Sequence, residues 1–172
     1  MRSVLIFTAC LMAAALGASA HGEVDERYVR AAALVNVAKF VEWPEGWSSG
    51  PFQIAVAADE DFATVLTAVT RNSRLHDREI RVRRLDGDDE DCQCHLLFVS
   101  APEDRRAALL LRGARSNYVL TIGETTAFLR EGGIVRLFRE DDRLRLQISL
   151  KGAEGSGLHF SSRLLSVAVR SQ

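Results

Sequence analysis

The spacing of hydrophobic residues along the chain predicts strands that alternate with helices. Nearly continuous apolar runs are typical of buried strands, strict alternation is typical of half-exposed strands, and apolar residues three or four apart are typical of helices. Strands are predicted at 52–58, 79–85, 95–100, 118–123, 134–138 and 143–150. Helices are predicted at 25–41, 60–72, from 100 to 113, around 128–129 and at 161–170. This order predicts an α/β three-layer sandwich: a mostly parallel sheet with helices on both faces and an antiparallel C-terminal hairpin.

Local signals refine the ends of these elements. Asp59 can cap the helix at 60–72, and Ser100-Ala-Pro-Glu103 has the S-x-x-E pattern of a capping box. In the strand at 143–150, one face is expected to carry Leu144, Leu146, Ile148 and Leu150. In the last helix the core side is expected to carry Leu164, Val167 and Ala168, and the solvent side Arg163, Ser166 and Arg170.

The first 20 residues have the pattern of a secretory signal peptide. A basic start, Met1-Arg2, precedes an apolar run at 4–16 and the small-residue triplet Ala18-Ser19-Ala20. The apolar run is short for a membrane span. We therefore expect residues 1–20 to be removed and residues 21–172 to form one exported domain.

The charge balance argues against a nucleic-acid or acidic-membrane partner. The chain has 22 Lys and Arg and 23 Asp and Glu, so loss of Arg2 leaves 21 minus 23, a balance of −2. The net charge of a protein so close to neutral gives no electrostatic case for such partners.

Export makes cysteine oxidation the expected outcome, and the predicted mature chain has Cys92 and Cys94 separated by one residue. Three states stay open: a strained local disulfide, free thiols, or a bridge between two molecules. A metal site that includes His95 is disfavoured, because His95 would point to the other side of the strand and structural zinc normally has four ligands.

The sequence carries no recognisable catalytic set. It has neither a G-x-S-x-G elbow nor an H-E-x-x-H pair, and its four histidines are scattered. The glycine-rich segment at 150–165 reads G-x-x-G-x-G, which matches neither the dinucleotide fingerprint nor a P-loop, so we interpret it as a flexible turn. We predict a protein that is not an enzyme and that uses no cofactor and no metal.

The helix at 25–41 is apolar over far more than one side. A helical wheel places Tyr28, Ala32, Asn36, Lys39 and Trp43 in one stripe, and nearly all the rest of the circumference is apolar. Such an excess indicates either burial in a crowded layer or an exposed patch for a partner, and both interpretations stay open for this stripe.

The segment around this stripe resembles a known family. RAAALVNVAKFVEWP, residues 30–44, is similar to the first block of the YfiR-like family of small secreted bacterial proteins, which reads K-A-x-x-x-x-N-x-x-K-F-x-x-W-P. Arg30 replaces the usual lysine, and the matching residues are Asn36, Lys39, Phe40, Trp43 and Pro44. The segments at 94–100, 119–137 and 157–168 resemble the middle and the end of the family.

The resemblance implies a periplasmic α/β domain that regulates by protein contact. The best-known members restrain an inner-membrane diguanylate cyclase, a GGDEF protein, through its periplasmic domain, and so lower cyclic di-GMP and biofilm formation. The expected partner surface comprises Asn36, Lys39, Phe40, Glu42, Trp43, Trp47 and Arg163, and a homodimer is also plausible. Cys94 matches a family cysteine that forms a disulfide, but its usual upstream partner is absent and Cys92 is extra. The alternative function is a periplasmic small-ligand-binding module that serves a sensor kinase or a transporter.

Overall fold

The computed structural model describes residues 18–47, 49–87, 92–114 and 118–171. Most of the predicted signal peptide, residues 1–17, lies outside the described residues. The helices are α1 (Ala18–Ala38), α2 (Glu60–Thr70), η1 (Ala101–Arg106), α3 (Ala107–Ala114), α4 (Thr126–Arg130), α5 (Leu150–Ala153) and α6 (Ser162–Val167). The strands are β1 (Val41–Glu42), β2 (Phe52–Ala57), β3 (Arg74–Leu75), β4 (Arg78–Arg84), β5 (Leu96–Val99), β6 (Leu120–Gly123), β7 (Val135–Glu140), β8 (Arg143–Ser149), β9 (His159–Phe160) and β10 (Val169–Ser171).

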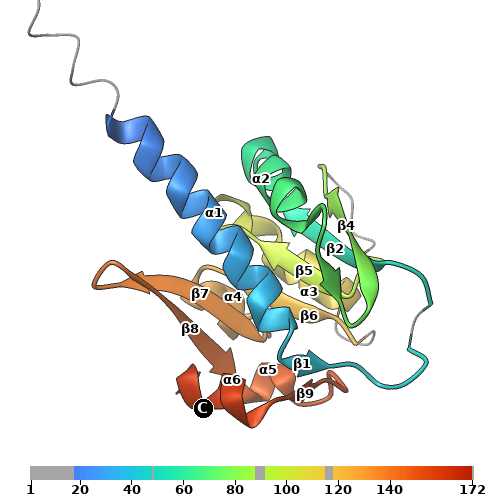
Figure 1. Ribbon diagram of the computed structural model, residues 1–172. Coiled ribbons are helices and arrows are strands. Elements are labelled where there is room, and N and C mark those ends of the chain that lie inside the picture. Colours follow the sequence, from blue (N-terminus) through green and yellow to red (C-terminus); the bar gives the residue numbers. More distant parts are fainter. Residues whose placement is uncertain (1–17, 48, 88–91, 115–117, 172) are drawn as a thin grey trace, which may run out of the picture.

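In the described part of the chain, eight strands form one mixed sheet in the order β10-β8-β7-β6-β5-β2-β4-β3. The neighbours from β4 through β2, β5 and β6 to β7 are parallel, and β7 and β8 form an antiparallel hairpin. Helices α1 and α2 cover one face, and α3 and α4 cover the other (Figure 1). The predicted three-layer α/β sandwich is confirmed.

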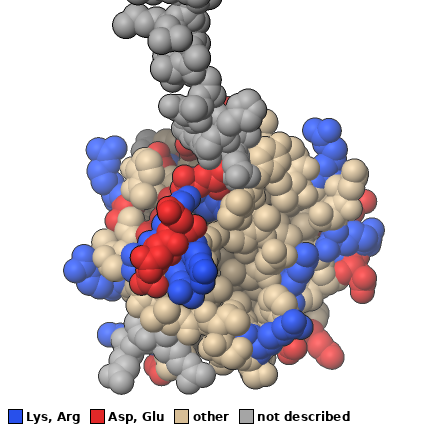
Figure 2. Space-filling model, turned by 60° about the vertical axis from the view of Figure 1, so that its left-hand side comes forward, with Lys and Arg blue, Asp and Glu red and all other residues tan. Residues whose placement is uncertain are grey.

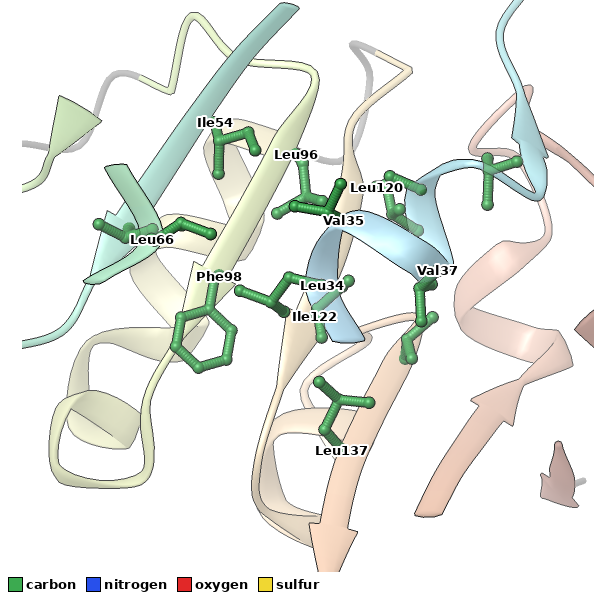
Figure 3. Close-up of a cluster of buried hydrophobic side chains, with 14 of the residues drawn as sticks. Leu34, Val35, Val37, Ile54, Leu66, Leu96, Phe98, Leu120, Ile122 and Leu137 are labelled. Atoms are coloured by element: carbon green, nitrogen blue, oxygen red, sulfur yellow. The ribbon is translucent and has the colours of Figure 1, made fainter. Parts of the chain in front are cut away.

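The central strands are buried on both faces, which explains their continuous apolar sequences. In β5, Leu96 and Phe98 join the core under α1 and α2, whereas Leu97 and Val99 join the core under α3 and α4. Figure 3 shows the larger core, in which Leu34 of α1 lies over β5 and β6. Burial of this kind stabilises the fold by about 25 cal/mol for each Å² of apolar surface removed from water.

The C-terminal region differs from the prediction because its strand and its helix each end earlier than the spacing of apolar residues predicts, and the chain turns at both ends. Leu150 does not continue the β8 face: the Ser149 side chain accepts a hydrogen bond from the Gly152 N–H and starts α5, which leaves Leu150 45% exposed. Val167 does not face the core. Helix α6 ends there, the chain extends to pair β10 with β8, and Val167 is 65% exposed. The hairpin is therefore not the edge of the sheet.

The predicted capping box at Ser100 is also wrong. Ser100 precedes η1 with extended backbone, but its side chain makes no capping hydrogen bond. A 3-10 turn forms instead, in which the Glu103 N–H donates to the Ser100 carbonyl, and the Glu103 carboxylate lies 3.3 Å from the Arg106 guanidinium. The cap of α2 does form as predicted, since the Phe62 N–H donates to the Asp59 carboxylate.

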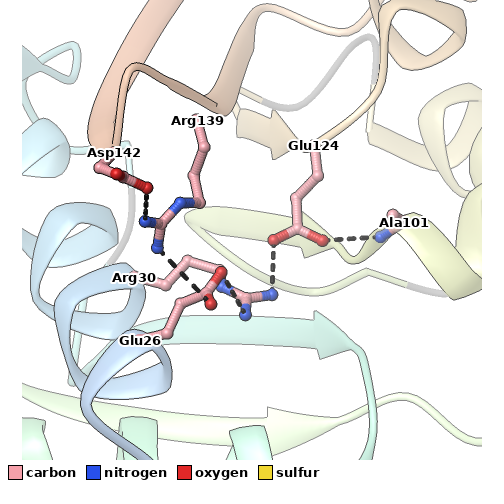
Figure 4. A network of polar contacts seen from close by, with 6 residues as sticks. All are labelled: Glu26, Arg30, Ala101, Glu124, Arg139 and Asp142. Carbon is pink, nitrogen blue, oxygen red and sulfur yellow. Dashed lines mark hydrogen bonds and ion pairs between the residues drawn. The ribbon is translucent and has the colours of Figure 1, made fainter. Parts of the chain in front are cut away.

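A polar network joins α1 to the carboxyl ends of β5 and β6. Just after β6, Glu124 accepts a hydrogen bond from Arg30 of α1 at 2.8 Å and another from the Ala101 N–H at 2.8 Å (Figure 4). Arg30 also lies 3.7 Å from Glu26. The Glu124 side chain is only 14% exposed, so the contact is largely shielded from solvent and fixes α1 on the sheet.

We predict that Glu124→Gln lowers the free energy of unfolding by about 2 kcal/mol, because the amide keeps an acceptor for Ala101 but leaves the partly buried Arg30 with only the more distant and more exposed carboxylate of Glu26. The midpoint of thermal unfolding should fall by roughly 4–8 °C. The matched control is Asp142→Asn. It removes an ion pair with Arg139 whose carboxylate is 98% exposed, and it should leave the midpoint unchanged. Equal midpoints for the two variants would contradict the prediction.

Candidate functional site

The polar stripe of α1 divides into two parts in the structure. Asn36 and Lys39 are exposed, and the Lys39 ammonium donates to the Asn36 side-chain oxygen at 3.1 Å. Trp43 is half-buried: its indole N–H donates to the Tyr118 carbonyl at 2.7 Å, and its ring meets the Phe52 ring edge-to-face at 5.2 Å. Trp43 therefore fixes the chain beyond α1 to the sheet, while Asn36 and Lys39 stay available to a partner.

Phe40 and Arg163, far apart in sequence, are brought together where the C-terminal segment folds back onto α1. Strands β1 and β9 pair antiparallel, and the Ser161 N–H donates to the Phe40 carbonyl at 3.0 Å. The Arg163 guanidinium carbon then lies 5.8 Å from the centre of the Phe40 ring, within reach of a cation–π contact. Glu42 is exposed on β1, on the other side of Val41.

An apolar groove of about 290 Å³ lies beside this contact, between α1, α6 and the β7–β8 hairpin. Its lining residues are Ala33, Asn36, Val37, Phe40, Leu137, Leu144, Arg145, Leu146, Arg163, Leu164 and Val167. We call it the α1–α6 groove. Three of the predicted partner-binding residues, Asn36, Phe40 and Arg163, line it, and Lys39 lies next to it through its bond to Asn36. The sequence did not identify the hairpin leucines as part of this groove. Their alternation shows which side of a strand they occupy, but not which other element that side faces.

Trp47 belongs to a different environment. Its ring packs edge-to-face on His95 at 4.3 Å and lies 6.0 Å from Tyr118, and the Phe52 ring also packs on His95, at 4.7 Å. The loop after α1 thus covers the start of β5 with aromatic rings. Trp47 contributes to this cover and does not line the α1–α6 groove.

His95 is buried at the centre of these rings, with 3% of its surface exposed. Its Nδ1 accepts a hydrogen bond from the Gln53 N–H at 3.1 Å, so Nε2 carries the proton of the neutral ring. That buried Nε2 has no hydrogen-bond partner among the residues that the structure describes. Burial, with a smaller contribution from the positive charge of Arg78, lowers the pKa of His95 to about 4. Sequence reasoning placed His95 at the start of a strand and disfavoured it as a metal ligand, but it did not predict the aromatic cover, since Trp47 is remote in sequence.

Cys92 and Cys94 are joined by a disulfide within the chain, and both are buried against the core under α3 and α4. The backbone bends before β5, which brings their Cα atoms to 5.1 Å, a separation common in disulfides. The bridge therefore pins the entry to β5. Among the described residues, no three His, Cys, Asp or Glu side chains are grouped in a way that could hold a metal ion.

The glycine-rich segment borders a second, more polar hollow of about 830 Å³ beside α3, α4 and α5. Its lining includes Thr121, Arg130, Gln147, Lys151 and Ser156. Gly155 and Gly157 adopt φ values of 77° and 70°, which suit a turn and agree with the interpretation of this segment. The hollow adjoins the end of α3 and the start of β6, whereas ligands of open α/β sheets usually bind at the carboxyl ends of the strands.

The lowered pKa of His95 predicts a specific pH dependence of stability. The folded state disfavours the protonated ring, so this contribution to stability is fully present above the ordinary pKa of 6.5 and is lost as the pH falls towards about 4. His95→Asn keeps an acceptor for the Gln53 N–H but cannot take up a proton. Between about pH 7 and pH 5, the drop in thermal midpoint should be smaller for this variant than for the wild type. His159→Asn, at an exposed position, is the control. Equal drops for wild type and His95→Asn would refute the assignment.

Two solved structures show the same fold at low sequence identity. A conserved domain protein from Vibrio cholerae O1 biovar El Tor matches with a TM-score of 0.58 and 10% identity over 85% of this chain and 60% of that one. A domain from Streptococcus pneumoniae, named as an ABC domain in complex with L-Trp, matches with a TM-score of 0.56 and 12% identity over 81% of this chain and 59% of that one. The chain thus spans about three fifths of each structure, and the likeness concerns the fold alone. No functionally curated protein gives a significant match.

The comparison with family models identifies the relationship. The YfiR/HmsC-like model matches residues 27–169, which include nearly all the described strands and helices. Across the described residues, no helix is both long and apolar enough to cross a membrane. The chain belongs to the YfiR/HmsC-like family, a non-catalytic, periplasmic family that works with membrane partners in the regulation of cyclic di-GMP signalling.

Proposed function

We propose that this protein restrains an inner-membrane diguanylate cyclase by contacting the periplasmic domain of that enzyme, and thereby lowers cyclic di-GMP and biofilm formation. One observation carries the proposal beyond family membership. Within the block that carries the family resemblance, Asn36 and Lys39 are exposed beside an apolar groove that Phe40 and Arg163 also line. An open apolar groove with charged side chains at its border is typical of a protein-binding surface.

The mechanism needs no chemistry on the part of this chain. A bound protein changes the activity of the cyclase only if it binds the inactive conformation more tightly than the active one. A preference of about 1.4 kcal/mol between the two conformations shifts their ratio tenfold. Burial of one or two apolar side chains in the groove, together with one ion pair at Lys39 or Arg163, is sufficient for a difference of that size.

The proposed surface is narrower than the sequence-based one. Its centre is formed by the lining residues Asn36, Phe40 and Arg163 together with Lys39, which contacts Asn36, and Glu42 is an exposed residue on the neighbouring strand β1. Trp43 and Trp47 are left out of the proposed surface, since their rings pack on other aromatic side chains of the same domain. Mutations at the two tryptophans should therefore act first on the fold.

We expect deletion of the gene to raise cellular cyclic di-GMP, and Lys39→Glu to raise it nearly as far without changing the thermal midpoint, because Lys39 is exposed. The matched control is Lys151→Glu, the same charge reversal at the other lysine, outside the groove.

Trp43→Ala should lower the free energy of unfolding by about 2 kcal/mol, because it removes a half-buried ring and an indole hydrogen bond. Cyclic di-GMP measured by mass spectrometry and thermal unfolding of the purified variants test these outcomes. Unchanged cyclic di-GMP in the deletion strain would contradict the proposal.

The second candidate function is a small-ligand-binding module, and the 830 Å³ hollow favours it, since its volume lies in the range of small-molecule sites. Under this function, an amino acid or a similar small metabolite added at about 100 times its Kd should raise the thermal midpoint by several degrees. Lys151→Glu, on the border of the hollow, should abolish that rise, and Lys39→Glu should not. Absence of any shift across a metabolite panel would exclude the module.

A further inference from the structure

The α1–α6 groove also indicates what kind of segment binds in it. Its floor comes from four elements, because Val37 lies on α1, Leu137 and Leu146 lie on the hairpin, and Leu164 lies on α6. Val167 is also part of the lining and is 65% exposed, so it adds apolar surface to the open side of the groove. Figure 2 brings forward the side on which the hairpin lies, and it shows a broad area of uncharged residues bordered by both basic and acidic residues.

The charged side chains that line the groove are all of one sign. Arg145 and Arg163 are the charged residues of its lining, and Lys39 lies next to the lining residue Asn36, whereas the lining contains no carboxylate. In the part of the chain that the structure describes, neither Arg163 nor Lys39 has a carboxylate within ion-pair distance. Arg145 forms an ion pair with Glu140 at 3.5 Å. The whole chain has a formal net charge of −1, so this border is a local positive patch on a slightly negative protein.

The size of the groove limits its occupant. A volume of about 290 Å³ accommodates a few apolar side chains and is at the small end of the range for sites that enclose a whole organic ligand. Grooves formed between helices and a hairpin commonly accept the apolar side of an amphipathic helix, which inserts residues spaced i, i+3 or i+4, and i+7. A helix of this kind with acidic residues beside its apolar ones would match both the floor and the border of the groove.

The same charges disfavour a second copy of this chain as the occupant. A two-fold contact would place one copy's groove against the other's, with Arg163, Arg145 and Lys39 of both copies close together. Like charges juxtaposed in an interface cost several kcal/mol. The complement of this patch is therefore a different, acidic chain.

We propose that the α1–α6 groove binds an acidic amphipathic helix from the periplasmic part of the cyclase, with apolar side chains on the floor and carboxylates on Arg163 and Lys39. The inference rests on the proposed function and specifies its contact. Because exposed charges mainly steer association, the complex should weaken as salt rises, and apolar burial should supply the remaining affinity.

The test measures binding of the purified mature protein to the purified periplasmic domain of the partner cyclase, at about 50 mM and about 300 mM salt, where screening differs markedly. Arg163→Glu should weaken binding at least about tenfold at low salt and reduce the salt dependence. Val167→Asp should weaken binding by a similar factor, and the exposure of Val167 makes this variant safe for the fold. The matched controls are Arg112→Glu on α3 and Leu150→Asp on α5, both exposed and outside the groove, and both should bind as the wild type does.

A charge exchange across the interface supplies the most direct support. A cyclase domain in which one acidic residue of the bound segment is replaced by Arg should bind the Arg163→Glu variant again. If deletion of the gene raises cyclic di-GMP but Arg163→Glu and Val167→Asp bind normally, the groove is not the contact, although the proposed function stands. If deletion changes nothing, the proposed function fails and this inference fails with it. If sedimentation shows a dimer that Val167→Asp converts to a monomer, a second copy fills the groove and the inference is overturned.

Discussion

Helix α1 carries more apolar surface than the sheet can cover. The arrangement of the C-terminal segment follows from how the remaining apolar surface is covered. Leu34, Val37 and Ala38 are buried against the sheet, as the hydrophobic effect requires. Ala33 and Phe40 are only partly covered. The C-terminal segment folds back through β9 and α6 to cover part of this remainder, and the part that it leaves open is the α1–α6 groove. Core and candidate surface are thus two sides of one helix.

The layered fold could be predicted because its signal is local. Strands such as β5, buried on both faces, must be apolar throughout. In the intervening helices the apolar residues recur with a period of 3.6 residues, so the sequence alone indicates an α/β sandwich. Strands of two or three residues, such as β1, β9 and β10, have no periodicity to detect. They exist because distant segments meet, and the misplacement of Leu150 and Val167 has the same origin.

The candidate site was only partly predictable for a related reason. A recurring block such as that at 30–44 combines residues that support the fold with residues that remain available to a partner, and the helical wheel places both in one stripe. Burial separates them: the Trp43 indole is fixed by Tyr118 and Phe52, while Lys39 stays in solvent. Likewise, the environment of His95 depends on Trp47, which covers it from a loop that no local pattern connects to β5.

The contact between Arg30 and Glu124 also fixes the position of α1 along the sheet. An α-helix that packs through small and medium apolar side chains could slide by one turn, 5.4 Å, and still bury comparable surface. A guanidinium fixed at 2.8 Å to a carboxylate at the end of β6 does not allow such a slide. Asn36 lies six positions beyond Arg30 on the same helix, so its position beside the groove depends on an anchor at the carboxyl ends of the strands. A single polar contact at the carboxyl edge of the strands thus determines which residues of α1 stand beside the groove.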